Sequence, residues 1–286
     1  MIYLESFILP TEWQEDEMIS HSMRIYNSIY PLRIFSSKNL EELTFDPITI
    51  FYGNNGSGKT TLLNIITNKL HASRKNINEF GPRFDEYVDL CSYQLTHNQY
   101  KEIKLISSDD VFDYLLDQRA VNSDVNRRKD LLVEEYRNLK YTPTEQLEDE
   151  YETMVKKVDA NRMTVSKYVR TRLGNNTIIQ QSNGQQALQF WSEQIQDNSL
   201  YIIDEPENSL SAENQIKLRQ FIEDSARFYN CQFIIATHSP FVLSLKDAKI
   251  YDLDADNCEV KKWYQLDNMK TYYQFFKDNS DDFNKE

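Results

Sequence analysis

The sequence predicts an α/β fold in which a mixed, mainly parallel sheet is interrupted by an inserted helical lobe. Three observations predict it: short β-prone runs near both ends of the chain, a glycine-rich turn between one such run and a helix, and charged helical sequence from about 97 to 180. The β-prone runs are 3–9, 32–35, 48–52, 200–203, 233–236 and 249–253. Because strands that alternate with helices are typical of parallel sheets, we assign 1–96 and 198–286 to one core and 97–197 to the lobe.

The glycine-rich turn follows the run 48–52. It reads Gly53-Asn54-Asn55-Gly56-Ser57-Gly58-Lys59-Thr60-Thr61 and leads into an apolar, helix-prone segment. Strand, glycine loop, Lys-Thr and helix in this order form a Walker A loop, whose amide groups and helix N-terminus bind phosphate. Lys59 is expected to reach the β- and γ-phosphates of ATP, and Thr60 to ligate Mg²⁺. In a chain with six glycines, such a pattern arises by chance roughly once in a thousand sequences or less.

A second motif follows the apolar run 200–203, which ends in Asp204-Glu205. This is a Walker B pattern, in which a buried strand carries two carboxylates to the carboxyl end of the sheet. We expect Asp204 to support Mg²⁺ and Glu205 to polarise the attacking water as a catalytic base.

A third motif, Thr237-His238-Ser239, follows the run 233–236. At a strand end beside a phosphate site, His238 can hydrogen-bond the γ-phosphate or the water, although a lone histidine is more often an ordinary loop residue. Asp204 and His238 are 34 positions apart, which leaves room for one crossover helix at about 213–229. We therefore expect them on neighbouring strands.

A fourth motif, Ser182-Asn183-Gly184, precedes a helical pattern. Ser182 and Gly184 at a helix N-terminus would form an anion site. Since the Walker A loop already binds the phosphates of its own subunit, this second site would serve the ATP of a second subunit. A plain helix cap is the alternative.

The insertion contains two apolar stripes at helical spacing on either side of Thr142-Pro143, which predicts a helical hairpin. The stripes are Leu132, Tyr136 and Leu139, then Leu147, Tyr151, Met154 and Val158. A basic stretch at 160–192 has no acidic residue and carries Arg162, Lys167, Arg170 and Arg172. It is a candidate DNA contact, with a solvated or internally paired face as the alternative.

Composition limits the classes of function. The net charge of −13 argues against a protein that mainly coats nucleic acid, because phosphate contact needs a basic surface. Three widely spaced cysteines suit a reducing compartment. The N-terminal segment has no secretory pattern and the apolar runs are too short to cross a bilayer. We therefore expect a cytoplasmic protein without membrane contact.

Together, the motifs resemble those of ABC-type ATPases, and more narrowly the soluble RecF/SMC-like and OLD-like branch. The phrases that carry the resemblance are Gly53 to Thr61, Asp204-Glu205-Pro206-Glu207 and Thr237-His238-Ser239-Pro240. The resemblance implies a P-loop NTPase fold of the ABC-ATPase type. It also implies a Q-loop glutamine that links Mg²⁺ to the helical lobe, best matched by Gln94, and a D-loop over 207–211.

The resemblance further implies a cytoplasmic ATPase that hydrolyses ATP in a head-to-tail homodimer and uses it as a conformational switch, in DNA maintenance or anti-phage defence. Two alternatives remain. One is a nucleotide-sensing module that gates a separate effector, such as a nuclease or toxin. The other is the ATP-binding subunit of a transporter.

Overall fold

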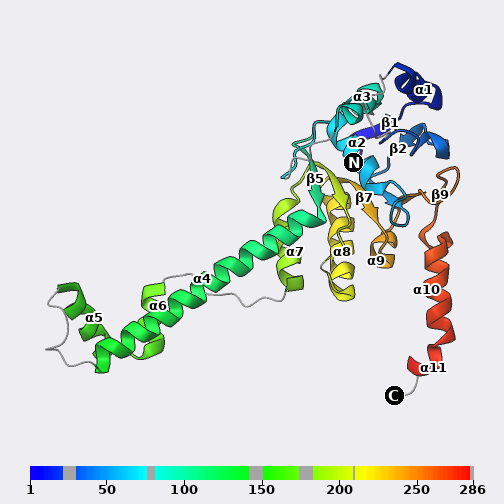
Figure 1. Cartoon of the computed structure of the whole chain (residues 1–286). Helices are drawn as coiled ribbons and strands as arrows, with labels where there is room; N and C mark the ends of the chain where they lie inside the picture. The colour runs from blue at the N-terminus through cyan, green and yellow to red at the C-terminus, as the bar shows by residue number, and fades with distance from the viewer. Residues whose placement is uncertain (22–29, 76–80, 142–150, 174–182, 209, 284–286) are drawn as a thin grey trace. The chain divides into compact units, whose positions relative to one another are not determined.

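A computed structural model gives the structure of residues 1–21, 30–75, 81–141, 151–173, 183–208 and 210–283. The chain divides into two compact units (Figure 1). One unit comprises Met1–Phe112 and Asn183–Glu286, and the other comprises Asp113–Ser182. The first unit contains both sheets and is called the core unit below.

The main sheet has six strands in the order β5-β6-β7-β3-β8-β9. Their bounds are β5 Ile103–Ser107, β6 Leu200–Asp204, β7 Gln232–Thr237, β3 Ile48–Tyr52, β8 Lys249–Asp252 and β9 Val260–Lys261. All neighbours are parallel except β9, which runs antiparallel to β8. The five parallel strands therefore end at one edge, called the carboxyl edge here, and begin at the opposite amino edge. The predicted α/β fold is confirmed.

A smaller antiparallel sheet has the order β2-β1-β4. Its strands are β1 Leu4–Ile8, β2 Glu42–Thr44 and β4 Ser92–Leu95. Gln232, the first residue of β7, connects the two sheets. Its buried amide accepts hydrogen bonds from the Tyr3 and Leu4 N–H groups at 2.8 and 2.9 Å and donates to the Leu4 carbonyl at 2.9 Å.

Helices cover both faces of the main sheet. Their bounds in the core unit are α1 Glu12–His21, α2 Lys59–Lys69, α3 Pro82–Leu90, α7 Asn183–Gln194, α8 Ala212–Phe228, α9 Pro240–Leu243, α10 Asp267–Asp278 and α11 Ser280–Phe283. On one face, Ile202 and Ile234 join α2 and the small sheet in a single apolar core. Because side chains alternate along a strand, Ile203 and Ile235 face the other side, where α8 contacts β7 and buries Leu218.

The second unit is helical. Helix α4, Ser108–Tyr141, begins in the core unit, and most of its length belongs to the second unit. It is followed there by α5 Tyr151–Arg162 and α6 Val165–Leu173. Tyr136 and Leu139 of α4 form a small core with Ala160 and Tyr168. Two of the three residues of the first predicted stripe are thus buried, whereas Met154 and Val158 of the second stripe remain about half exposed. Helix α4 therefore packs on Ala160 of α5 and Tyr168 of α6, in place of the second half of the predicted seam.

Two sequence expectations differ from the structure. The run Leu32–Phe35, predicted as β-prone, lies in turns before a 3-10 helix at Ser36–Lys38, with its end residues buried and Arg33 at φ 66°, outside the strand region. The compact helical unit is also narrower than the predicted lobe of 97–197. Residues 103–107 form β5 of the main sheet, and the helix that begins at Asn183 belongs to the core unit.

Candidate active site

The loop between β3 and α2 is shaped by two glycines. Gly56 and Gly58 have φ angles of 85° and 104°, a left-handed conformation that favours glycine. A Cβ on Gly58 would also come within 3.0 Å of Ile34. Helix α2 begins at Lys59 directly after this turn, so its first amide groups have no acceptor within the helix. This arrangement leaves a set of backbone donors for an anion, as the Walker A sequence predicts.

Lys59 is buried at the base of this loop. Its Nζ donates to the carbonyl oxygens of Gly53 and Asn54 at 2.7 and 3.2 Å. Thr60 is exposed, and the Thr61 hydroxyl accepts a hydrogen bond from the Tyr30 hydroxyl at 3.2 Å. The carbonyls of Gly53 and Asn54, at the start of the predicted loop, therefore both contact the Lys59 ammonium group.

Asp204 ends β6, directly beside Ala236 of β7. Burial raises the pKa of its carboxyl to about 6, against the opposing effects of a hydrogen bond with Thr60 and the charge of Lys59. Its Oδ1 is buried and has no hydrogen-bond partner among the described residues. A carboxylate oxygen left open beside a threonine hydroxyl is the kind of donor set that Mg²⁺ prefers, so these residues fit the metal that the motif implies.

Glu205 follows in a strained conformation, with φ 47°. Its N–H donates to the Ala236 carbonyl at 2.9 Å, and its Oε2 accepts from the Asn208 side chain at 3.1 Å. The side chain is about a quarter exposed, and its Oε1 lies 3.8 Å from His238 Nδ1. The backbone turn thus directs a partly solvated carboxylate toward the histidine, on the same edge as Asp204.

His238 lies on the neighbouring strand end, as predicted, and a second carboxylate orients it. Glu207, whose side chain is 5% exposed, accepts hydrogen bonds from the Thr237 hydroxyl at 2.7 Å and the His238 N–H at 3.0 Å. The same oxygen lies 3.4 Å from His238 Nδ1. Glu207 was predicted only as part of the D-loop. The second acid of the Asp-Glu-Pro-Glu phrase was the available signal for this additional role.

Ser211, the last residue of the predicted D-loop, caps a helix in the structure. Its hydroxyl accepts a hydrogen bond from the Asn214 N–H, which caps the N-terminus of α8. Within its own subunit Ser211 therefore has a local structural use.

The structure does not bring Gln94 to this group of residues. Gln94 is exposed on β4 of the small sheet, where it pairs with Ser6 of β1. The strand beside β6 is instead β5, and Ser107 at its end pairs with Asp204. A hollow next to Thr60 and Asp204 is lined by this strand end and the start of α4, including Ser107, Ser108, Asp109 and Asp110. The alternation of apolar residues over 103–106 was the signal that could have found this strand.

The fourth motif lies only partly within the described residues, because Ser182 falls outside them. Gly184 is in the first turn of α7, and a Cβ there would come within 2.0 Å of the Asn214 side chain of α8. A larger residue at this position would therefore displace the Asn214 side chain inside the same subunit.

The basic stretch has at least one internal pairing. Arg172 forms an ion pair with Asp159 at 3.0 Å and stacks over the Tyr168 ring at 3.8 Å. Arg162 and Lys167 are exposed, while the side chain of Arg170 is outside the described set. The pairing of Arg172 favours the structural interpretation of this residue over a DNA contact.

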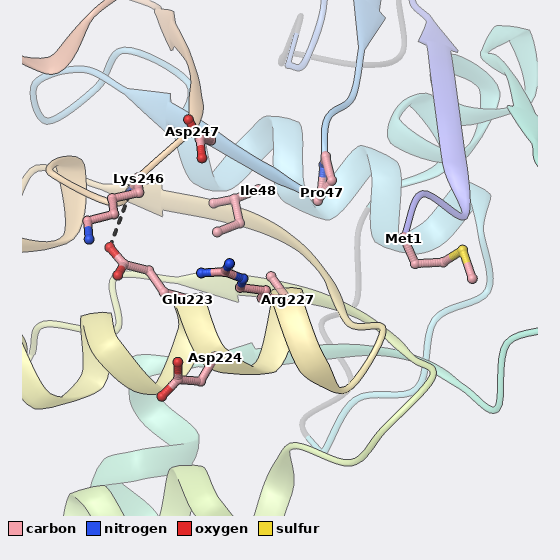
Figure 2. Close-up of a pocket in the computed structure, with 9 residues that line it drawn as sticks. Met1, Pro47, Ile48, Glu223, Asp224, Arg227, Lys246 and Asp247 are labelled. Atoms are coloured by element: carbon pink, nitrogen blue, oxygen red, sulfur yellow. Dashed lines mark hydrogen bonds between the residues drawn. The ribbon is translucent and has the colours of Figure 1, made fainter.

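A larger hollow of about 680 Å³ lies at the amino edge. Figure 2 shows charged residues of α8 and of the loop before β8 around it, including Glu223, which accepts from the Lys246 N–H at 3.1 Å. No residue of the four motifs lines it. The sequence motifs thus converge at the carboxyl edge, away from this hollow.

Comparison with protein families gives one match over residues 92–244, a little over half of the chain, to the family described as "AAA domain, putative AbiEii toxin, Type IV TA system". The matched segment includes Asp204, Glu205 and His238 but begins after the glycine loop. A search of curated proteins finds no significant match. None of the helices in the described residues combines the length and apolar character needed to cross a bilayer.

Three solved structures are similar at low identity. One is titled "An inward-facing conformation of a putative metal-chelate type ABC transporter" (TM-score 0.38, 19% identity, 81% of this chain and 80% of that chain). Another is a dimeric ATP-binding cassette bound to ADP and Pi (0.36, 17%, 78% and 88%). The third is the SMC head domain from Thermotoga maritima (0.34, 11%, 91% and 99%). These scores and identities are too low to carry an argument about function.

Proposed function

We propose, from the premise that this chain belongs to the family described as "AAA domain, putative AbiEii toxin, Type IV TA system", that it is a cytoplasmic ATPase that works as a nucleotide-driven switch. The observation that carries the proposal is the convergence of Lys59, Asp204, Glu205 and His238 at one edge of the main sheet. A phosphate-binding loop, an open carboxylate and an oriented acid–histidine pair are the parts that phosphoryl transfer to water requires.

Each residue has a separate role in this proposal. The loop amides and Lys59 bind the phosphates and neutralise their charge. When bound to Thr60 and Asp204, Mg²⁺ would supply charge neutralisation at the β- and γ-phosphate oxygens. Glu205 accepts a proton from the attacking water, and His238, held by Glu207, orients the water or the γ-phosphate.

We further propose that two copies associate head to tail on binding ATP, with Ser182 and Gly184 of each completing the phosphate site of the other. An anion-binding helix N-terminus that follows Ser182 supports this arrangement. The close packing of Gly184 on Asn214 means that this glycine alone does not argue for a dimer.

A second candidate is supported by the description of the family, which names a toxin and a type IV toxin–antitoxin system. In this version the ATP cycle gates a separate effector in a defence system, and hydrolysis limits how long the effector is active. Binding of ATP without net turnover by the isolated chain, together with turnover in the presence of a partner, would favour it.

The primary test compares two lysines on one helix. Lys59→Ala should abolish ATP binding in a calorimetric titration with Mg²⁺, because the buried ammonium at the loop is lost. Lys69→Ala, at the other end of α2, where Nζ donates to the Asp89 carbonyl, should bind ATP normally. Equal binding by both variants would reject the proposed site.

The dimer is tested by light scattering on the Glu205→Gln protein with and without ATP. Adding Ser182→Arg should prevent the ATP-induced increase in mass while ATP still binds to the monomer. Substitution of Gly184 is a less specific test, because a side chain there would also displace Asn214 of the same subunit. An ATP-induced dimer that persists with Ser182→Arg would reject the head-to-tail arrangement.

A further inference from the structure

The phosphate-binding loop is supported from outside by residues that belong to none of the four motifs. Strand β8 lies next to β3 in the main sheet, so the residues after β8 reach the start of the loop. There, both oxygens of the Asp254 carboxylate lie within hydrogen-bond distance of the Asn54 N–H, at 3.0 and 2.9 Å. The two residues are 200 positions apart.

Lys38 supports the other end of the same loop. Its Nζ donates to the Ser57 carbonyl at 2.9 Å and to the Leu253 carbonyl at 2.6 Å. Lys38 therefore links the loop to the residue directly before Asp254. Asp254 thus binds the Asn54 N–H at the beginning of the turn, and Lys38 binds the Ser57 carbonyl near its end.

The hydrogen bonds of the loop divide into two sets. The Ser57 and Gly58 carbonyls and the Asn54 N–H are bonded to the protein, the Gly58 carbonyl by the Leu62 N–H at 2.8 Å. Among the described residues, the amide groups of Gly56 and of 58–61 have no protein acceptor. Because the support residues hold the Asn54 N–H and the Ser57 carbonyl, they fix the loop in the form that keeps this second set available for phosphate.

Asp254 is itself held in place. Its N–H donates to Asp252 Oδ1 at 3.1 Å, and the other oxygen of Asp252 accepts from Lys261 at 2.8 Å. From α10, the Asn268 side chain donates to Asn54 Oδ1 at 3.0 Å. Several elements of the C-terminal segment thus converge on Asn54.

We propose that Asp254 and Lys38 are positioning residues that preorganise the loop for nucleotide binding. This inference rests on the proposed ATPase function. Loss of either side chain lets the loop sample other conformations, and ATP must then order it on binding. The affinity for ATP falls, while the turnover of bound ATP stays close to that of the wild type, because the carboxylates at the reacting end are untouched.

The experiment uses the full chain and the variants Asp254→Ala, Asp254→Asn, Lys38→Ala and the control Asp256→Ala. Asp256 is exposed in the same segment and makes no hydrogen bond to the loop within the described residues. Asp254→Ala should weaken ADP and ATP binding about tenfold, within the range for loss of one charge-assisted hydrogen bond, and raise KM with little change in kcat. Asp254→Asn, which keeps one acceptor oxygen, should lie between Asp254→Ala and the wild type.

A second measurement does not depend on nucleotide. Hydrogen–deuterium exchange of the peptide that contains 53–61, in the absence of nucleotide, should be faster in Asp254→Ala and Lys38→Ala than in Asp256→Ala. Thermal unfolding confirms that each variant is folded. Combining Asp254→Ala with Lys38→Ala should weaken binding by less than the product of the single effects, since both hold the same loop.

Identical affinities and identical exchange in Asp254→Ala and Asp256→Ala would overturn the inference, as would a loss confined to kcat. If the wild-type chain bound no nucleotide, the proposed function would fail. Exchange of the loop peptide would still decide whether Asp254 holds the loop.

Discussion

The two edges of the main sheet differ in whether the buried polar side chains described here have hydrogen-bond partners. At the amino edge, both the oxygen and the nitrogen of the fully buried Gln232 amide are bonded to backbone groups of the small sheet. At the carboxyl edge, one oxygen of Asp204 and one of Glu207 are buried without a partner among the described residues, and Glu205 has a left-handed backbone. Since unpaired buried oxygens and strain oppose folding, function rather than stability accounts for these three acidic residues at the carboxyl edge.

A choice of site by cavity volume would have selected the amino edge. The amino-edge hollow of about 680 Å³ is far larger than the hollow of about 120 Å³ beside Asp204. Its charged residue Glu223 is bonded to the Lys246 N–H. The comparison teaches that the convergence of the motif residues locates this site better than cavity size does. Removing the Glu205 carboxylate at the carboxyl edge should therefore lower activity, and removing the bonded Gln232 amide at the amino edge should lower stability.

The largest expected effect is on turnover. Glu205→Gln keeps the shape of the side chain but removes the base, so kcat for ATP should fall about 10²–10⁴-fold, as for loss of a general base. ATP affinity and melting temperature should stay near those of the wild type. Steady-state phosphate release and calorimetry measure these quantities, with Glu223→Gln at the amino edge as the control. Wild-type turnover by Glu205→Gln would show that another group activates the water.

The next effect is on stability and tests the opposite edge. Gln232→Leu leaves the N–H groups of Tyr3 and Leu4 without partners, and each unsatisfied buried group costs about 1–3 kcal/mol. The free energy of unfolding, measured by urea titration, should fall by about 3 kcal/mol, with ATP affinity unchanged below the unfolding transition. Gln189→Leu on the exposed face of α7 is the control. A variant as stable as this control would mean that Gln232 does not hold the two sheets together.

How much the sequence could predict depends on whether the signal is local. The glycine loop, Asp204-Glu205 and Thr237-His238 each follow a strand directly along the chain, so their strands and their shared edge were predicted and confirmed. The short strand β5 was missed, because Ile103–Ser107 is surrounded by charged sequence.

Contacts between distant segments had no such local signal. The sequence does not show that Asp254 meets a residue 200 positions away, or that Gln94 lies in a different sheet from Asp204. The apolar run Leu32–Phe35 is compatible with a strand, but its burial is achieved in turns. Tertiary packing decided these cases, and local propensity did not.

A third prediction uses the raised pKa of Asp204, about 6. Burial disfavours the ionised form of Asp204 in the folded, metal-free protein, so above pH 6 this carboxyl lowers the free energy of unfolding. The destabilisation becomes smaller as the pH falls toward 3.8, the pKa of the carboxyl in the unfolded chain. Asp204→Asn should therefore raise the free energy of unfolding by about 2–3 kcal/mol at pH 8 and by about half as much at pH 5.

Urea titrations in EDTA at these two pH values measure the effect. Asp224→Asn, an exposed residue of α8 near the amino edge, is the control and should change stability little at either pH. A gain that is equal at both pH values would contradict the raised pKa, and a loss would mean that burial of the charge is compensated.

The smallest expected effect separates positioning from direct catalysis at the carboxyl edge. Glu207→Gln keeps an oxygen for the Thr237 hydroxyl and the His238 N–H but removes the negative charge 3.4 Å from His238 Nδ1. We expect kcat to fall about tenfold, less than the 10²–10⁴-fold that an acid–base group contributes directly, with ATP affinity unchanged. Glu223→Gln at the amino edge should leave turnover unchanged. If Glu207 acts through His238, Glu207→Gln should have no further effect in a His238→Ala background, whereas multiplying effects would show that the two residues act independently.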